Sequence, residues 1–314
     1  MGAAAVWTAM NLARPATLDL KSAKIAAVVN AASGRCSVAT GDALRAHLEA
    51  RGLKPARVWC GPAPELERTL DAVMADRPDI LLVLGGDGTV RTVAERCDRT
   101  GPLLMPLPGG TMNVLPRALY GARSWRRAID DVLSAPQLRP VNGAEAAGRR
   151  FFAAAIFGGP SLLQEAREAV RYGELGPAVR KGLTALRSAL DRELICLWDG
   201  GSPAKGEVVA VLCPLASRRL TARDARLEAA VIDLAGPVDA LRLVLAAAFR
   251  DWRADPDVRC ATAKVLEVLS SDRIPALLDG ERFSFEGPLR VTVLGEAFYA
   301  LTPAAPSEAD ALRL

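Results

Sequence analysis

The chain of 314 residues contains one histidine, and its six cysteines show no metal-binding spacing. His47 lies between Ala46 and Leu48 in a segment with helical periodicity, so we assign it no catalytic role. No Cys-x-x-Cys pair occurs among the cysteines, which are Cys36, Cys60, Cys97, Cys196, Cys213 and Cys260. These absences argue against a histidine-based triad and against a zinc site. They indicate free thiols in a reducing cytoplasm instead.

The chain also lacks a long apolar run and a strong charge imbalance. No segment reaches the roughly 18 uninterrupted apolar residues that a membrane-spanning helix needs. The net charge of +4 is too small to indicate a nucleic acid partner, although it modestly favours an anionic membrane surface. Residues 1–23 are expected to form a loose extension, because Met1–Pro15 has no basic segment ahead of its apolar residues. We expect a cytoplasmic protein.

The composition is that of a globular protein, with 50% hydrophobic and 24% charged residues. A chain of 314 residues is too long for one simple core, which predicts two domains. Apolar runs alternate with helical segments from Lys24 to Leu133, which predicts an α/β domain whose parallel sheet is covered by helices on both faces. From about residue 141 short strand-like runs predominate, one of them at Leu289–Leu294, and two helical stretches, Ser161–Asp191 and Pro237–Trp252, interrupt them. This pattern predicts a second, β-rich domain.

The most informative stretch is Ile80–Arg91, in which an apolar run stops at Gly-Gly-Asp-Gly-Thr. The run predicts a buried parallel strand, and the spacing of Val90, Val93 and Ala94 predicts a helix after the glycines. Glycines at a strand-to-helix turn let backbone N–H groups approach a ligand, and a helix start favours an anion such as phosphate. Asp87 would hold a magnesium ion or orient the substrate, because its charge repels a phosphate.

A second segment of the same kind follows at Leu103–Asn113, where an apolar strand ends in Pro-Gly-Gly-Thr-Met-Asn. Two such units place two ligand loops at the carboxyl edge of a parallel sheet, where open α/β sheets bind ligands. The plain alternative is that Gly-Gly-Asp-Gly is only a tight turn. Neither the dinucleotide pattern nor the P-loop pattern is present.

These two loops resemble the catalytic domain of the diacylglycerol kinase family, which includes bacterial lipid kinases and sphingosine and ceramide kinases. Two flanking segments add to the resemblance. Val28–Gly34 is similar to the family's first strand and its Asn-Pro-x-Ser-Gly loop, with Ala31 in place of proline. Leu278–Glu281 is similar to its late Asp-Gly-Glu motif. The four segments occur in the family's order and span roughly residues 25–285.

The resemblance implies a nucleotide-binding α/β domain, a β-sandwich-like domain and an active site in the cleft between them. We place the first domain at residues 24–140, joined by about 297–314 at the end of the chain, and the second at 141–296. The implied reaction is phosphoryl transfer from ATP, with Mg²⁺, to a lipid hydroxyl, most simply that of diacylglycerol. Transient peripheral contact with the inner face of the membrane would follow, and a homodimer stays open.

Residue roles follow from the same resemblance. The implied nucleotide-binding residues are Asn30, Ala31, Ala32, Ser33, Gly34, Gly85, Gly86, Asp87, Gly88, Thr89, Val90, Arg91, Gly110, Thr111 and Asn113. Glu281 matches the family's proton acceptor for the lipid hydroxyl, and Asp279 would assist it, through magnesium or as a like charge that raises the pKa of Glu281. Asp87 would act near the metal, so Asp87 and Asp279 are the candidate magnesium ligands. Without the upstream loops, Asp279-Gly280 would be taken as a hairpin turn.

The chain departs from the family pattern at three places. Ala229-Ala230 replaces an Asp-Gly pair whose Asp helps to hold a structural magnesium, so that site is lost unless Glu228 or Asp224 substitutes. After Phe151-Phe152-Ala153, within a strand that we expect to run from Arg150 to Phe157, Ala154 replaces an Asn, and Gly158-Gly159-Pro160 then replaces a Gly-x-Asp. Met112 stands where glycine is commoner.

Three further interpretations stay open. Leu162–Arg192 predicts a basic amphipathic helix, either a solvated face or a membrane contact. An NAD kinase or a related soluble kinase would share Gly-Gly-Asp-Gly-Thr, but its Asn-Glu acceptor pair is not found. A non-catalytic relative that binds nucleotide or lipid is the third, and the retained Asp87 and Glu281 argue against it.

Overall fold

The computed structural model describes residues 19–158, 193–221, 224–233 and 252–304. It divides into two compact units. The first comprises Met1–Val141 and Glu296–Leu314, and the second comprises Asn142–Gly295. Within the described ranges, every helix is too short or too polar to traverse a lipid bilayer.

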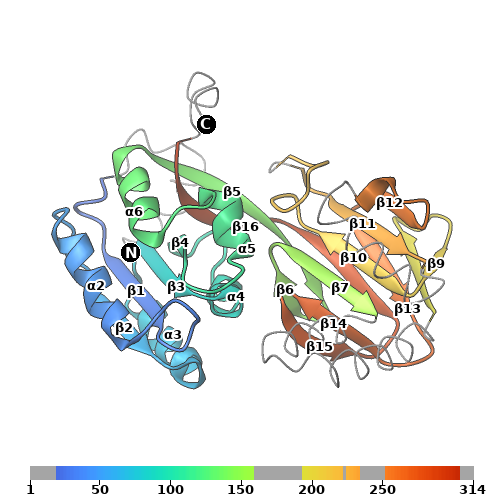
Figure 1. Cartoon of the computed structure of the whole chain (residues 1–314), viewed down its shortest axis with the longest axis horizontal. Helices are drawn as coiled ribbons and strands as arrows, with labels where there is room; N and C mark the ends of the chain where they lie inside the picture. The colour runs from blue at the N-terminus through green and yellow to red at the C-terminus, as the bar shows by residue number, and fades with distance from the viewer. Residues whose placement is uncertain (1–18, 159–192, 222–223, 234–251, 305–314) are drawn as a thin grey trace, which may run out of the picture. The chain divides into compact units, whose positions relative to one another are not determined.

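The first unit is built on a parallel sheet in the order β2-β1-β3-β4 (Figure 1). Its strands are β1 (Ile25–Asn30), β2 (Arg57–Gly61), β3 (Ile80–Gly85) and β4 (Leu103–Pro108). Every residue of β1 and β3 is buried, as expected for parallel strands that are covered on both faces. The last part of β16 (Leu289–Pro303) pairs with β4 in parallel, with Ala300 opposite Leu104.

Helices connect these strands. They are α2 (Val38–Glu49), α3 (Leu66–Ala75) after a 3₁₀ turn at Ala63–Glu65, α4 (Asp87–Glu95), α5 (Val114–Tyr120) and α6 (Trp125–Ser134). Each presents an apolar stripe to the interior, for example Leu44 and Leu48 of α2, which are four residues apart. The predicted α/β class is confirmed.

The second unit contains an antiparallel sheet in the order β12-β11-β10-β7-β14-β15. These strands are β7 (Ala154–Gly158), β10 (Val208–Leu212), β11 (Leu227–Ile232), β12 (Val258–Ala263), β14 (Ile274–Leu278) and β15 (Glu281–Phe285). A further antiparallel run, β16-β13-β8-β9, belongs to the same unit. Its other strands are β8 (Leu194–Trp198), β9 (Ala204–Gly206) and β13 (Val265–Leu269). A 3₁₀ turn at Trp252–Ala254 precedes β12.

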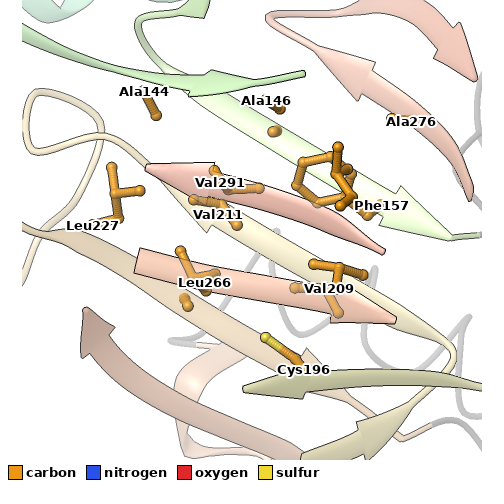
Figure 2. Close-up of a cluster of buried hydrophobic side chains, with 14 of the residues drawn as sticks. Ala144, Ala146, Phe157, Cys196, Val209, Val211, Leu227, Leu266, Ala276 and Val291 are labelled. Carbon is orange, nitrogen blue, oxygen red and sulfur yellow. The ribbon is translucent and has the colours of Figure 1, made fainter. Parts of the chain in front are cut away.

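The core of the second unit takes side chains from both sheets. Phe157, Val209 and Val211 come from the antiparallel sheet, and Leu266 and Val291 come from β13 and β16. Figure 2 shows these side chains gathered between the strands. A single core enclosed by two layers of strands is a sandwich, which confirms the predicted β-rich class.

Two features of the chain path differ from the prediction. The strand predicted at Arg150–Phe157 is two strands, β6 (Arg149–Phe151) and β7, separated at Phe152 and Ala153. The predicted strand at Leu289–Leu294 continues to Pro303, and β5 (Pro136–Ala146) starts four residues before the predicted domain boundary. Both β5 and β16 contribute residues to both units. The helices predicted at Ser161–Asp191, which takes in most of the basic stretch Leu162–Arg192, and at Pro237–Trp252 lie outside the described residues, except for Trp252.

Candidate functional site

Three loops of the first unit follow the carboxyl ends of β1, β3 and β4, which are neighbours in the sheet. The chain goes from β1 outward to β2 and from β3 outward to β4, so the order of the strands reverses between β1 and β3. Open α/β sheets bind ligands at such a switch point, beyond the carboxyl ends of the strands. The sequence predicted this edge, and the structure brings the three loops into contact there.

The first loop is hydrogen-bonded to the start of α4. Ser33 Oγ accepts a hydrogen bond of 2.9 Å from the N–H of Gly86, the N-cap residue of α4. Asn30, at the end of β1, donates from Nδ2 to Thr89 Oγ1 at 2.8 Å. Both residues of this second bond are buried, with 6% and 7% of their surfaces exposed. The first loop is therefore held against the first turn of α4 at two points.

Asp87 fastens the loop after β4 to the same turn. Its carboxylate accepts from the N–H of Asn113 at 2.9 Å and from the N–H of Val114 at 2.5 Å. Val114 is the first residue of α5, so the carboxylate caps that helix from another element. Burial raises the pKa of the Asp87 carboxyl above its ordinary value, although the Val114 and Asn113 N–H groups act in the opposite direction.

Asn113 shapes the loop after β4 from within. It adopts a left-handed backbone conformation, with φ 53° and ψ 51°, which asparagine tolerates better than most residues. Its Oδ1 accepts from the N–H of Gly110 at 2.8 Å, and its Nδ2 donates to the Gly110 carbonyl at 2.9 Å. The Asn113 side chain is therefore committed to the loop itself.

The glycines permit backbone-to-backbone contact between the loops. A Cβ atom on Gly110 would lie 2.6 Å from Gly86 Cα, and one on Gly109 would lie 2.8 Å from Gly85 N. Gly109 also donates its N–H to the Gly85 carbonyl at 3.0 Å and accepts from Arg35 N–H at 2.9 Å. No side chain fits between these backbones, which explains why glycine occupies both loops.

Many polar groups of the three loops are hydrogen-bonded to one another, but several backbone N–H groups are not. Within the described ranges, the backbone N–H groups of Gly34, Gly88, Thr89 and Thr111 have no hydrogen-bond partner. Gly88 and Thr89 lie in the first turn of α4, where N–H groups have no acceptor inside the helix. Ser33 Oγ already accepts from Gly86, so its own proton is available for donation. The site therefore offers donors to an anion.

Asp279 and Glu281 belong to the second unit. Asp279 and Gly280 form the two-residue turn between β14 and β15, both with positive φ, at 47° and 88°. The Asp279 carboxylate accepts from three backbone N–H groups, those of Phe152 at 2.8 Å and of Ala153 and Ala154 at 2.9 Å. It thereby holds the chain where β6 ends and β7 begins.

Glu281 stands opposite Leu278 at the start of β15. Phe283 lies opposite Ala276 on the next pair of the same face, and both Leu278 and Ala276 are core residues. The partly buried Glu281 side chain is therefore directed to the core-facing side of the sheet, at its end. This position is compatible with a carboxylate beside an apolar acceptor.

The chain is similar to known proteins both in sequence and in fold. Residues 24–145 match the family model described as diacylglycerol kinase catalytic domain. The predicted family resemblance is confirmed. The whole fold is similar to that of a diacylglycerol kinase from Bacillus anthracis str. Sterne, with 20% identity over 93% of this chain and 100% of that chain and a TM-score of 0.69. It is also similar to yeast NADH kinase in complex with NADH, with 11% identity over 93% of this chain and 86% of that chain and a TM-score of 0.51.

The resemblance to the diacylglycerol kinase family implies magnesium, and Asp87 and Asp279 are its predicted ligands. Among the described residues, no group of three or more His, Cys, Asp or Glu side chains could hold a metal ion. Both oxygens of Asp87 and both oxygens of Asp279 accept backbone N–H groups. That geometry is structural, and the metal-holding roles of these two residues stay predictions without support from it.

The structural magnesium of the family does not fit this chain. Glu228 was one possible substitute, but its buried carboxylate takes the guanidinium of Arg253, with Nη2 at 3.0 Å from Oε2, and the Ser217 hydroxyl at 2.5 Å. Asp224, the other, accepts from the N–H and hydroxyl of Thr221. The Arg253 guanidinium thus occupies the position beside Glu228 that a metal ion would need.

Sequence reasoning missed two residues at these places. Gly109 was not assigned to the site, although its position before Gly110 in the same motif was a usable signal. Arg253 carries no signal in the sequence, because it is 25 residues from Glu228 and only the folded chain brings the two together.

Proposed function

We propose that the protein is an ATP- and Mg²⁺-dependent lipid kinase that transfers the γ-phosphoryl group of ATP to a lipid hydroxyl. The observation that carries this proposal is the convergence of three loops in which, within the described ranges, the backbone N–H groups of Gly34, Gly88, Thr89 and Thr111 have no hydrogen-bond partner. Phosphoryl transfer requires such a cradle, because its catalysis rests on positioning and on stabilising the charge of the phosphates. The family match over residues 24–145 supports a kinase.

Each group has a role in this proposal. The N–H groups of Gly34, Gly88, Thr89 and Thr111 and the hydroxyls of Ser33 and Thr111 would bind the phosphates of ATP. Magnesium would enter with ATP and would neutralise charge on its phosphates, as is usual for this ion. Glu281 would accept the proton of the attacking lipid hydroxyl, which lets the oxygen attack the γ-phosphorus as ADP leaves.

Diacylglycerol or a related lipid is the acceptor that we favour, because the resemblance and the similar fold of a Bacillus anthracis diacylglycerol kinase agree. A lipid acceptor also entails transient contact with the inner face of the membrane. The likeness to yeast NADH kinase supports the second candidate, a soluble kinase that phosphorylates a dinucleotide.

A transfer assay separates the candidates. Purified full-length protein is incubated with Mg²⁺ and γ-³²P-labelled ATP against diacylglycerol, monoacylglycerol, sphingosine, ceramide, undecaprenol, phosphatidylglycerol and NAD, and the products are partitioned between organic and aqueous phases. We expect label in the organic phase with a lipid acceptor. Label in the aqueous phase with NAD would replace the proposal by the soluble kinase. No label from protein that binds ATP would indicate a non-catalytic relative.

The Glu281→Gln variant tests the proton acceptor in the same assay. General-base catalysis contributes typically about 10²- to 10⁴-fold, so we expect turnover to fall within that range while ATP affinity is kept. Undiminished turnover would remove Glu281 from the chemistry.

A further inference from the structure

We propose that Asn30 is a positioning residue that sets phosphate affinity through Thr89 and does not itself contact the nucleotide. The inference rests on the proposed function, because it concerns how the same cradle binds ATP. It differs from what the resemblance implies, which is nucleotide contact by Asn30.

The Asn30 side chain is buried and engaged within the protein, which leaves it little access to a ligand. Only 6% of the residue is exposed, and both ends of its amide are used. Nδ2 donates to Thr89 Oγ1 at 2.8 Å, and Oδ1 accepts from the N–H of Ala32 at 3.0 Å. Because the Ala32 N–H can only donate, it fixes the amide oxygen on its side and turns the NH₂ group toward Thr89.

These bonds belong to a closed ring of hydrogen bonds and backbone segments that includes Ser33 and the first turn of α4. From Asn30 the ring passes to Thr89, back along the first turn of α4 to Gly86, and from the Gly86 N–H to Ser33 Oγ at 2.9 Å. It closes through the Ser33 N–H, which donates to the Asn30 carbonyl at 3.1 Å. A break at any member lets the first loop and the helix start move apart.

The ring determines where the phosphate donors lie. Because Ser33 Oγ accepts from Gly86, the Ser33 proton is directed away from that bond, and the N–H groups of Gly88 and Thr89 leave the helix end beside it. The Asn30–Thr89 bond, at the carboxyl end of β1, fixes the distance between the Ser33 hydroxyl and the N–H groups at the start of α4. Phosphate binding needs both sets of donors at once, whereas binding of a base and sugar does not.

Two substitutions, alone and combined, test this relation. Asn30→Ala removes the bridge, Thr89→Val removes its acceptor with little change of shape, and the double variant removes both. Titration calorimetry with ATP, ADP and adenosine measures each protein. We expect each single variant to lose about ten- to a hundredfold in affinity for ATP and ADP, because a displaced donor loses its hydrogen bond to a charged phosphate. The affinity for adenosine should be unchanged. The exposed Asp42→Ala on α2 is the control and should bind as the wild type does.

The double variant decides between positioning and contact. If Asn30 acts through Thr89, the double variant binds ATP no more weakly than the weaker of the two single variants. The reason is that the Asn30–Thr89 bond is already absent from each single variant. Additive losses would overturn the inference and assign Asn30 a contact of its own. Wild-type affinity in Asn30→Ala, or an equal loss for adenosine and ATP, would overturn it as well. A wild-type protein that binds neither ATP nor ADP would overturn the proposed function, and the inference with it.

Discussion

At the scale of single residues, the Asp87 carboxylate joins the loops that follow β3 and β4. Asp87 starts α4 and accepts hydrogen bonds from the N–H groups of Asn113 and Val114, the residues that begin α5. Its charge lies at two helix starts, where a negative charge is favourable. In the folded chain the Asp87 carboxylate fastens the loop after β4 to the start of α4, and its role as a magnesium ligand stays a prediction.

Asp87→Ala therefore opens the second loop even without metal or nucleotide. Two N–H groups lose their acceptor, that of buried Asn113 and that of partly buried Val114, and we expect a loss of about 1–3 kcal/mol in the free energy of unfolding. Amide hydrogen exchange of Asn113 and Val114, measured by NMR in the presence of a chelator, should accelerate. The exposed Asp42→Ala on α2 is the matched control and should leave these amides unchanged. Unchanged exchange in Asp87→Ala would show that the carboxylate does not fasten this loop.

A second carboxylate, that of Glu228, is buried in the second unit with 1% of its surface exposed. Burial alone would raise its pKa, but hydrogen bonds from Arg253 and Ser217 hold the pKa below its ordinary value. A carboxyl whose pKa is lowered by folding contributes stability above its unfolded pKa and loses it as the pH falls through the folded pKa.

We therefore expect the thermal unfolding midpoint to fall as the pH is lowered below about 4, the ordinary range of glutamate. Glu228→Gln should flatten that dependence and destabilise the protein by about 3–5 kcal/mol at neutral pH, because it leaves the Arg253 charge buried and unpaired. Glu267→Gln, which breaks an exposed ion pair with Arg290, is the control and should cost at most about 1 kcal/mol. Equal effects of the two substitutions would contradict the role given to the buried pair.

At the scale of elements, the cradle depends on glycine backbones that touch. Gly110→Ala places a Cβ 2.6 Å from Gly86 Cα, a contact that only a backbone shift can relieve. We expect a loss of about 1–3 kcal/mol in stability and a loss of at least about tenfold in ATP affinity. In Gly295→Ala the added atom meets nothing within 4 Å, so this variant should behave as the wild type does. Equal ATP affinity in both variants would separate the loop contact from nucleotide binding.

The elements also show what a sequence can predict. Buried strands such as β1 and β3 are apolar along their whole length and end at glycine-rich or polar loops, so their positions were predictable. The break between β6 and β7 was not, because its cause is a carboxylate 125–127 residues away, that of Asp279. The same limit applies to the candidate site. The loop segments were predictable from their motifs, but the partners of Asn30, Asp87 and Asn113 were not.

At the scale of the whole molecule, each unit supports one half of the proposed reaction. The first unit carries the family match and the donor-rich loops, and the second carries Glu281 on a strand of its sandwich. The similar fold of a Bacillus anthracis diacylglycerol kinase, which this chain covers over its full length, extends the likeness to both units.

The most direct test records which backbone amides respond when ¹⁵N-labelled protein is titrated with a non-hydrolysable ATP analogue and Mg²⁺. We predict that the largest shifts in the NMR spectrum fall on Gly34, Gly88, Thr89 and Thr111, whose N–H groups have no partner within the described ranges. The same titration with adenosine should leave these four amides nearly unmoved. Saturable binding whose shifts avoid all four amides would contradict the assignment of the three loops as the phosphate cradle.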